Sequence, residues 1–230
     1  MALVPARGGS KSLPRKNLRE IAGKPMVAHS IGHCLASTTI TRTILTTDDP
    51  EIAEVGRNAG AEVPFMRPAE FARDHSTDYE FVRHALLWLK ENEDYEPDMV
   101  VQIRPTTPMR RIDLIDAAVC ALAACPEADS LRAVVEACFS PFKMWTKNED
   151  GFLTPLLSLP GMPEPYNQPR QILPQAYQQD GFIDITRPRT IFELNSITGD
   201  KILPFFLDRE SIDIDHEHEF VDAEHAMKAG

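Results

Sequence analysis

Strand-like and helix-like segments alternate through the first half of this chain, and this order restricts the folds open to it. Short apolar or β-branched runs typical of buried strands occur at residues 2–5, 41–46, 63–66 and 99–103. Helical patterns lie between and after them, starting at Pro25, running from Pro50 to Gly60, and covering residues 77–91 and 111–124. The first helix should bury Val27, Ile31, Cys34 and Leu35. This order predicts a largely parallel sheet with helices on both sides.

The alternation stops after about residue 138. Residues 154–174 contain six prolines, too many for a regular helix or strand. Strand patterns return at 182–186 and 202–206, with a helix opened by Pro188 and a last helix from about His216. We therefore expect one α/β domain over residues 1–230, with a Rossmann-like, mixed but mostly parallel sheet and an arm inserted at about 139–178.

Charge and composition exclude several classes of function. The formal net charge of −11 argues against nucleic acid as a partner, because an acidic surface repels phosphate backbones. The apolar runs stop short of the roughly 20 residues that cross a bilayer, and the N-terminus turns polar too soon for a signal peptide. The four cysteines form no CxxC pair, as in reduced cytoplasmic proteins. We expect a cytoplasmic protein without a membrane partner.

A basic loop, PARGGSKSLPRKN at residues 5–17, follows the first expected strand. Residues 1–24 carry six basic side chains and one acidic one, a net charge of +5 within an acidic chain. Gly8 and Gly9 allow backbone N–H groups to approach a phosphate, and Arg7, Lys11 and Lys16 supply positive charge. The loop matches neither a Walker A motif nor G-x-G-x-x-G. It is either an anion site or a solvated basic loop.

An acidic motif, SIDID, lies near the other end of the chain. Asp213 and Asp215 are two residues apart, so an extended backbone would direct both carboxylates to one face. Hard oxygen ligands beside a phosphate loop indicate Mg²⁺. The alternative is a pair of carboxylates on a solvated edge.

Two further polar segments end expected strands or begin expected helices. IRPTTPMR, residues 103–110, places Arg104, Thr106 and Thr107 at the carboxyl end of a strand, where open α/β sheets bind ligands. It can equally be a rigid connector. Ser76, Thr77 and Asp78 lie where a polar loop leads into the helix at 77–91; they either cap that helix or read a base edge.

Five motifs in this order resemble those of the acylneuraminate (CMP-sialic acid) cytidylyltransferases: PARGGSKSLPRKN, RPAEFARD, RPTTPMR, QPRQILPQAY and SIDID. The resemblance extends from about residue 2 to about residue 225. It implies a nucleotide-diphospho-sugar transferase fold and a homodimer built by the arm. It also implies transfer of CMP from CTP to the anomeric hydroxyl of a 3-deoxy-2-keto sugar acid, with release of pyrophosphate.

The resemblance assigns roles to residues position by position. The catalytic set comprises Arg7, Lys11, Lys16, Asn17 and Asp213. The nucleotide-binding set comprises Ala6, Arg7, Gly8, Gly9, Lys16, Asn17, Arg67, Thr77 and Asp78. The sugar-binding set comprises Arg104, Thr106, Lys143, Arg170, Gln175 and Asp184, of which Lys143 would reach into the partner subunit's site. Asp213 and Asp215 would hold Mg²⁺.

Departures from the family pattern leave the substrates open. Arg104 replaces a Gln, Asp184 replaces a Tyr, Asp78 stands where a Ser is common, and residues 196–198 replace paired phenylalanines. Arg104 suits a substrate carboxylate through bidentate pairing. The base can be cytosine or guanine, and a Kdo-type enzyme is an alternative. A nucleotide- or sugar-binding protein without turnover would not need the metal pair, and a P-loop kinase would need a Walker A motif.

Overall fold

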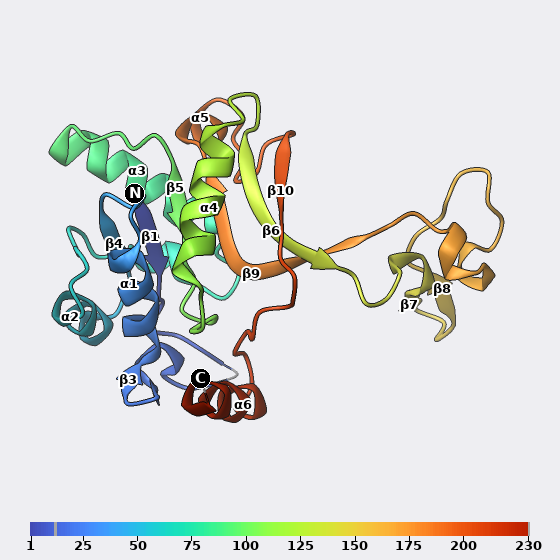
Figure 1. The fold of residues 1–230 in the computed structure, drawn as a ribbon, viewed down its shortest axis with the longest axis horizontal. Helices are drawn as coiled ribbons and strands as arrows, with labels where there is room; N and C mark the ends of the chain where they lie inside the picture. Colours follow the sequence, from blue (N-terminus) through green and yellow to red (C-terminus); the bar gives the residue numbers. More distant parts are fainter. Residues whose placement is uncertain (12, 230) are drawn as a thin grey trace.

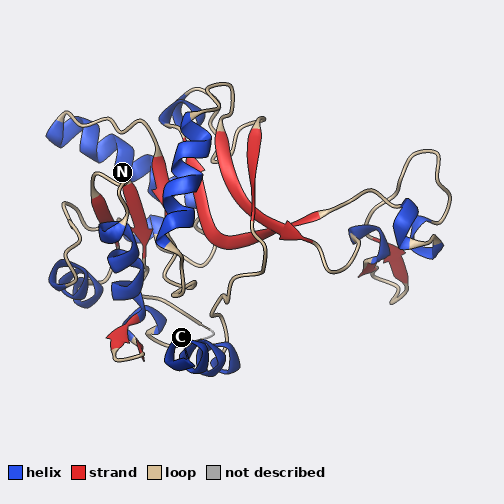
Figure 2. Cartoon of the chain, in the orientation of Figure 1, coloured by secondary structure: helices blue, strands red, loops and turns tan. Residues whose placement is uncertain are grey.

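A six-stranded mixed sheet forms the centre of the computed structural model, which describes residues 1–11 and 13–229 (Figures 1 and 2). Its strand order is β10-β6-β9-β5-β1-β4. The bounds are Ala2–Pro5 for β1, Thr43–Thr46 for β4, Val100–Gln102 for β5, Ser130–Glu136 for β6, Tyr177–Thr186 for β9 and Ile202–Phe206 for β10. Only β9 runs antiparallel to its neighbours, β5 and β6. The predicted mixed, mostly parallel sheet is confirmed.

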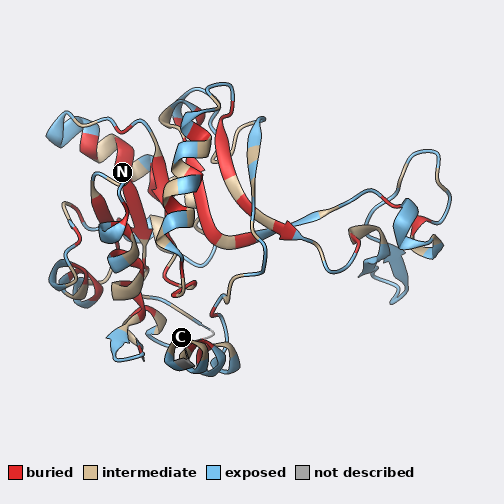
Figure 3. Cartoon of the chain, in the orientation of Figure 1, coloured by how far each residue is buried: buried red, intermediate tan, exposed pale blue. Residues whose placement is uncertain are grey.

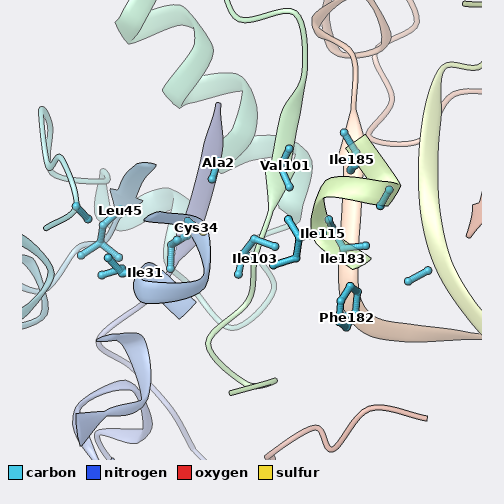
Figure 4. Close-up of a cluster of buried hydrophobic side chains, with 14 of the residues drawn as sticks. Ala2, Ile31, Cys34, Leu45, Val101, Ile103, Ile115, Phe182, Ile183 and Ile185 are labelled. Atoms are coloured by element: carbon cyan, nitrogen blue, oxygen red, sulfur yellow. The ribbon is translucent and has the colours of Figure 1, made fainter. Parts of the chain in front are cut away.

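Helices cover both faces of the sheet. On one face, α1 (Met26–Ala36), α2 (Pro50–Asn58) and α4 (Ile112–Ala123) contribute to a large apolar cluster, shown in Figure 4. On the other face, α3 (Asp78–Glu93) and α5 (Pro188–Phe192) pack over β4, β1 and β5. The last helix, α6 (Glu217–Ala229), packs near the basic loop through a third cluster that includes Leu13 and Ile214.

Capping residues fix the starts of two helices. Asp49 caps α2 by accepting hydrogen bonds from the N–H groups of Glu51 and Ile52, and Pro50 occupies the first turn. Thr77 and Glu80 form a capping box at the start of α3. These positions agree with the helix starts that the sequence predicts.

An arm, residues 137–176, projects from the sheet between β6 and β9 (Figure 1). It contains the two-stranded hairpin of β7 (Trp145–Lys147) and β8 (Leu153–Pro155) and the single turns Pro141–Lys143, Pro165–Asn167 and Arg170–Ile172. Its root is closed by a hydrogen bond from Ala137 N–H to the carbonyl of Ala176, 3.0 Å. Most of the arm surface is exposed (Figure 3), including Phe139, Phe152 and Leu153.

Short elements complete the chain. A small hairpin joins β2 (Glu20–Ile21) to β3 (Lys24–Pro25), and single turns lie at Lys16–Leu18 and Ala69–Phe71. Among the described residues, no helix combines the length and apolar character needed to cross a membrane.

Several details differ from the sequence-based expectations. Residues 63–66 form no strand, because Pro64 has no N–H to donate; β4 gains only a bridge between Ile44 and Glu62. The helix α1 starts one residue after Pro25, and Leu35 lies on its exposed side. The sequence pattern does not predict β6, and β9 begins five residues before the expected start at 182.

Candidate active site

A pocket of about 430 Å³ lies at the carboxyl ends of β1 and β5. It combines six basic side chains with three carboxylates. The lining residues are Pro5, Arg7, Gly9, Ser10, Lys11, Lys16, Asn17, Arg67, Phe71, Arg73, Asp74, Ser76, Asp78, Phe81, Arg104, Pro105, Thr106 and Asp215. The fold therefore brings together the basic loop, the turn after β5 at residues 104–106, and Asp215 of the acidic motif.

Hydrogen bonds within the basic loop and to residues 46–48 hold the loop in shape. Asn17 donates from its amide to the carbonyl of Arg7, 2.9 Å, and the N–H of Gly8 donates to Asp48, 2.9 Å. Gly8 is needed because a Cβ there would lie 2.8 Å from Oδ2 of Asp49, whereas Gly9 faces open space. The N–H of Ala6 donates a hydrogen bond to the carbonyl of Thr46, 3.0 Å. The backbone donors of Ala6 and Gly8 thus hold the loop, and Gly9 is the glycine that lines the pocket.

Asp74 holds two cations of this loop at the pocket. Its carboxylate pairs with Arg7 at 3.0 Å and with Lys11. The Lys11 ammonium, and then the Arg7 guanidinium, keep the pKa of Asp74 below its usual value. An anion of higher charge can compete with this carboxylate for both cations.

The acidic motif meets the basic loop through Lys16. Nζ of Lys16 lies 2.7 Å from Oδ1 of Asp215 and 3.0 Å from the carbonyl of Ile214. The N–H of Ile214 donates to the carbonyl of Thr106, 2.8 Å, which ties the motif to the turn after β5. Asp213 lies 3.5 Å from the hydroxyl of Thr107. Both aspartates are exposed and flank the buried Ile214.

The two aspartates can serve as ligands for a hard cation. No group of three or more His, Cys, Asp or Glu side chains suitable for a metal occurs in the described part of the chain. Asp213 and Asp215 are exposed carboxylates, one beside Thr107 and one paired with Lys16. Mg²⁺ commonly takes one or two protein carboxylates and completes its shell with water and substrate phosphates. The donor set of Asp213 and Asp215 therefore fits this ion.

Arg67 forms a buried wall of the pocket. Its guanidinium donates to the hydroxyl and carbonyl of Thr46, at 3.1 and 2.6 Å, and lies 4.6 Å from the ring centroid of Phe81. Burial lowers its pKa to about 10, so the side chain remains charged at neutral pH.

Arg104 links two carboxylates beside the pocket. It donates to Asp184 at 2.6 Å and to Asp78 at the start of α3. Burial opposes its charge, but the two carboxylates outweigh that effect and raise its pKa. Arg132 on β6 donates to the other oxygen of Asp184, 2.9 Å. Thr77 is used as the cap of α3 and does not line the pocket.

Three predicted sugar-binding residues lie on the arm instead. Lys143 donates to the carbonyls of Tyr166 and Gln168, at 3.2 and 2.8 Å. Arg170 contacts Glu136 and the carbonyl of Ala137, and Gln175 lies at the arm root. Figure 1 shows the arm directed away from the pocket end of β1. The chain alone does not bring these side chains to the pocket.

Arg110 is the buried last residue of the RPTTPMR motif, and the sequence analysis assigns it no role. It donates to the carbonyls of Thr107, Phe182 (2.6 Å), Arg104 (2.8 Å) and Gly181 (3.1 Å) and to the hydroxyl of Ser30 (3.2 Å). Burial lowers its pKa to about 9. It thereby joins the turn after β5 to β9 and α1. The sequence RR at 110–111 gives no sign of which arginine is buried.

The pocket combines the basic loop with Asp215 at the carboxyl ends of an α/β sheet, and Asp213 lies outside the pocket lining, against Thr107. A basic, phosphate-sized site in this place is typical of nucleotide-binding enzymes. Residues 1–149 match the protein family described as Cytidylyltransferase, and the chain belongs to this family. Its sequence is 40% identical over 119 residues to a CMP-N,N'-diacetyllegionaminic acid synthase of Legionella pneumophila, covering 52% of this chain and 51% of the relative. It is 35% identical over 116 residues to a pseudaminic acid cytidylyltransferase of Campylobacter jejuni, covering 50% and 49%. The chain thus spans about half the length of these two relatives.

The fold is shared with solved structures. A CMP:2-keto-3-deoxy-manno-octonic acid synthetase complexed with CTP superposes with a TM-score of 0.74, covering 99% of this chain and 98% of the other. The identity is 16%, so this similarity concerns the fold.

Proposed function

We propose that this chain transfers CMP from CTP to the anomeric hydroxyl of a 3-deoxy-2-keto sugar acid of the nonulosonate type and releases pyrophosphate. The observation that carries the proposal is the 2.7 Å ion pair between Lys16 and Asp215, which joins the basic loop and the acidic motif across one pocket. The names of the relatives support the substrate class, since both act on nonulosonic acids.

The basic loop binds the triphosphate in this proposal. The sugar hydroxyl attacks the α-phosphorus and pyrophosphate leaves, so negative charge grows on the phosphate oxygens and the leaving group. Arg7 and Lys11 exchange Asp74 for phosphate oxygens, and Lys16, which pairs with Asp215, adds a third positive charge. Asn17 holds the loop through the carbonyl of Arg7. Once the triphosphate is bound, these cations are in place and stabilise the transition state without further rearrangement.

Asp213 and Asp215 hold Mg²⁺ in this proposal. When bound, Mg²⁺ neutralises charge on the phosphate oxygens. Thr107 lies next to Asp213 and the carbonyl of Thr106 anchors Ile214, so the turn after β5 orients the aspartates.

The same proposal includes a homodimer. The arm exposes several large apolar side chains that its own chain leaves uncovered: Phe139, Met144, Trp145, Phe152, Leu153, Leu156, Leu157 and Ile172. Exposed apolar surface of this extent favours a protein interface. A second copy of the chain would bring Lys143 and Arg170 toward a pocket that they cannot reach in their own chain.

The test is pyrophosphate release by the purified chain with Mg²⁺, using CTP and GTP against several nonulosonic and octulosonic acids. We expect release with CTP and a nonulosonic acid, and at least a ~100-fold lower rate for Lys16→Met and Asp215→Asn. Lys90→Met, which removes an exposed lysine on α3, serves as the matched control and should keep the wild-type rate. Absence of release with every pair of substrates, or wild-type rates in both site variants, would contradict the proposal.

A further inference from the structure

One row of residues crosses all six strands on the α3 side of the sheet and changes from apolar to polar at β5. The strand register aligns Ile44, Leu3, Gln102, Asp184, Arg132 and Pro204 in this order. Ile44 and Leu3 are buried in the cluster under α3. The next three positions carry an amide, a carboxylate and a guanidinium. A sheet face that needs only packing does not require such groups.

The polar part of this row begins beside the pocket. Arg104 lines the pocket and lies 2.6 Å from Asp184, which in turn lies 2.9 Å from Arg132. Gln179 on β9 is exposed and reaches Asp184 at 3.4 Å. Oε1 of Gln102 is buried without a hydrogen-bond partner among the described residues. The protein groups alone therefore do not complete the hydrogen bonding of the row.

The two arginines of the row are used differently. Both terminal nitrogens of Arg104 already donate to carboxylates, one to Asp78 and one to Asp184. Arg132 donates only through Nε, and its two terminal nitrogens have no protein partner in the described part of the chain. Its side chain is 26% exposed. Two parallel N–H groups match the two oxygens of a carboxylate.

We propose that the sugar acid binds at the accessible end of the polar row and that Arg132 binds its carboxylate, while Arg104 is a positioning residue that holds the buried Asp184. This inference rests on the proposed function. It assigns the substrate carboxylate to Arg132, whereas the sequence motif at residues 103–110 favours Arg104. The ligand class is an anionic sugar with hydroxyl or acylamino groups, for which Gln179 offers an amide beside the row.

The charges agree with this division of roles. Arg104 faces two carboxylates, so a substrate carboxylate would add a third negative group to one guanidinium. Arg132 shares Asp184 with Arg104, so its positive charge is only partly compensated. The carboxylate therefore binds more favourably at Arg132.

The experiment compares the KM for the best sugar acid of the panel with the KM for its methyl ester. Arg132→Met should raise the KM for the acid roughly ten- to hundredfold, leave the KM for CTP unchanged and remove the preference for acid over ester. Arg132→Lys should restore part of that preference, because it keeps the charge but loses the paired N–H groups. Folding should survive, because Asp184 keeps Arg104 as its partner in Arg132→Met.

Controls separate binding from structure. Arg42→Met removes an arginine of similar exposure, 20%, that pairs with Glu62 and Glu93 at the amino end of β4, and it should keep the preference for the acid. The inference would be overturned if Arg132→Met kept the preference for the acid over the ester. It would also be overturned if Arg104→Met lost this preference while Arg132→Met kept it. Either result would leave the proposed function intact. A wild-type chain that releases no pyrophosphate with any sugar acid would overturn the proposed function and this inference with it.

Discussion

His33 on α1 is a titratable side chain that the fold largely removes from water. Its Nδ1 is buried without a hydrogen-bond partner among the described residues. Burial lowers the pKa of His33 to about 4, and the charges of Arg110 and His29 act in the same direction. Arg110 is the buried cation that joins the turn after β5 to β9 and α1, and its positive charge disfavours a second charge on His33.

The chain should lose stability when the pH falls from about 6.5 to about 4. In this window the unfolded His33 takes up a proton and the folded one does not, so protonation favours unfolding, by at most about 3 kcal/mol. Urea titrations across this range measure the free energy of unfolding. His33→Gln should flatten the pH dependence, whereas His75→Gln, at an exposed loop position, should not. If the free energy of unfolding fell equally steeply with pH in the wild type and in His33→Gln, the loss of stability could not be assigned to His33.

At the residue scale, the sequence identifies which charged residues belong to the site, but not the groups with which they form hydrogen bonds and ion pairs. Lys16, Arg67, Asp78, Arg104 and Asp215 were predictable as site residues, and they line the pocket. The roles of Arg110 and Arg132 depend on which carbonyls and carboxylates the folded chain places around them. Partners such as Phe182 for Arg110 and Asp184 for Arg132 lie tens of residues away, and no local pattern identifies them.

The strand β9 is the element that connects the sheet, the site and the arm. It pairs with β5 and β6, and its register with β6 shifts between Arg132 and Val134. Gly181 lies at this irregularity, and a Cβ there would meet the Thr107 hydroxyl at 2.9 Å and Asp213 at 3.6 Å. The close approach of β9 to the turn after β5 therefore requires a glycine.

Gly181→Ala should lower the rate of pyrophosphate release about tenfold or more, because a displaced Thr107 and Asp213 no longer hold their geometry. The loss of stability should be modest, about 1–3 kcal/mol from overpacking. Gly32→Ala on α1, where a Cβ has open space, is the control and should leave activity unchanged. Steady-state rates and thermal unfolding of the same samples measure both effects. A wild-type rate in Gly181→Ala would show that the contact does not matter.

Elements with strong local signals could be predicted, and those shaped by pairing could not. The cap at Asp49 and Pro50 identifies α2, and the apolar periodicity identifies α3. The strand β6 escapes prediction because Arg132 interrupts its apolar run, and its partner Asp184 lies on the neighbouring strand β9. The first residues of β9 are polar and exposed, so only their pairing with β6 makes them a strand.

The whole molecule consists of a sheet domain with a pocket and an arm that extends away from it (Figure 1). The resemblance of the motifs predicts an arm, but no pattern in the sequence says where it points. Because Lys143 and Arg170 lie on this arm, their proposed roles depend on a second copy of the chain.

Mixing two inactive variants tests this dependence. Lys143→Ala lacks the arm lysine, and Asp215→Asn lacks a metal ligand of the pocket; each alone should be strongly impaired. If each pocket receives Lys143 from the partner, mixed dimers contain one intact site, and activity should partly return after the two variants exchange subunits. Sedimentation should show a dimer for both variants and a monomer for a chain carrying Phe152→Asp and Leu153→Asp, both exposed on the arm. No recovery in the mixture would place Lys143 outside the partner's site.

The closed root of the arm has a consequence for how such chains can diversify. Glu136 and Tyr177 are paired neighbours in the sheet, and Ala137 bonds directly to Ala176, so the chain leaves and re-enters the domain at almost the same point. An insertion with its ends fixed in this way can change in length or sequence without shifting the strands on either side. The arm is therefore a module that can vary in length and sequence while the sheet that carries the pocket stays the same.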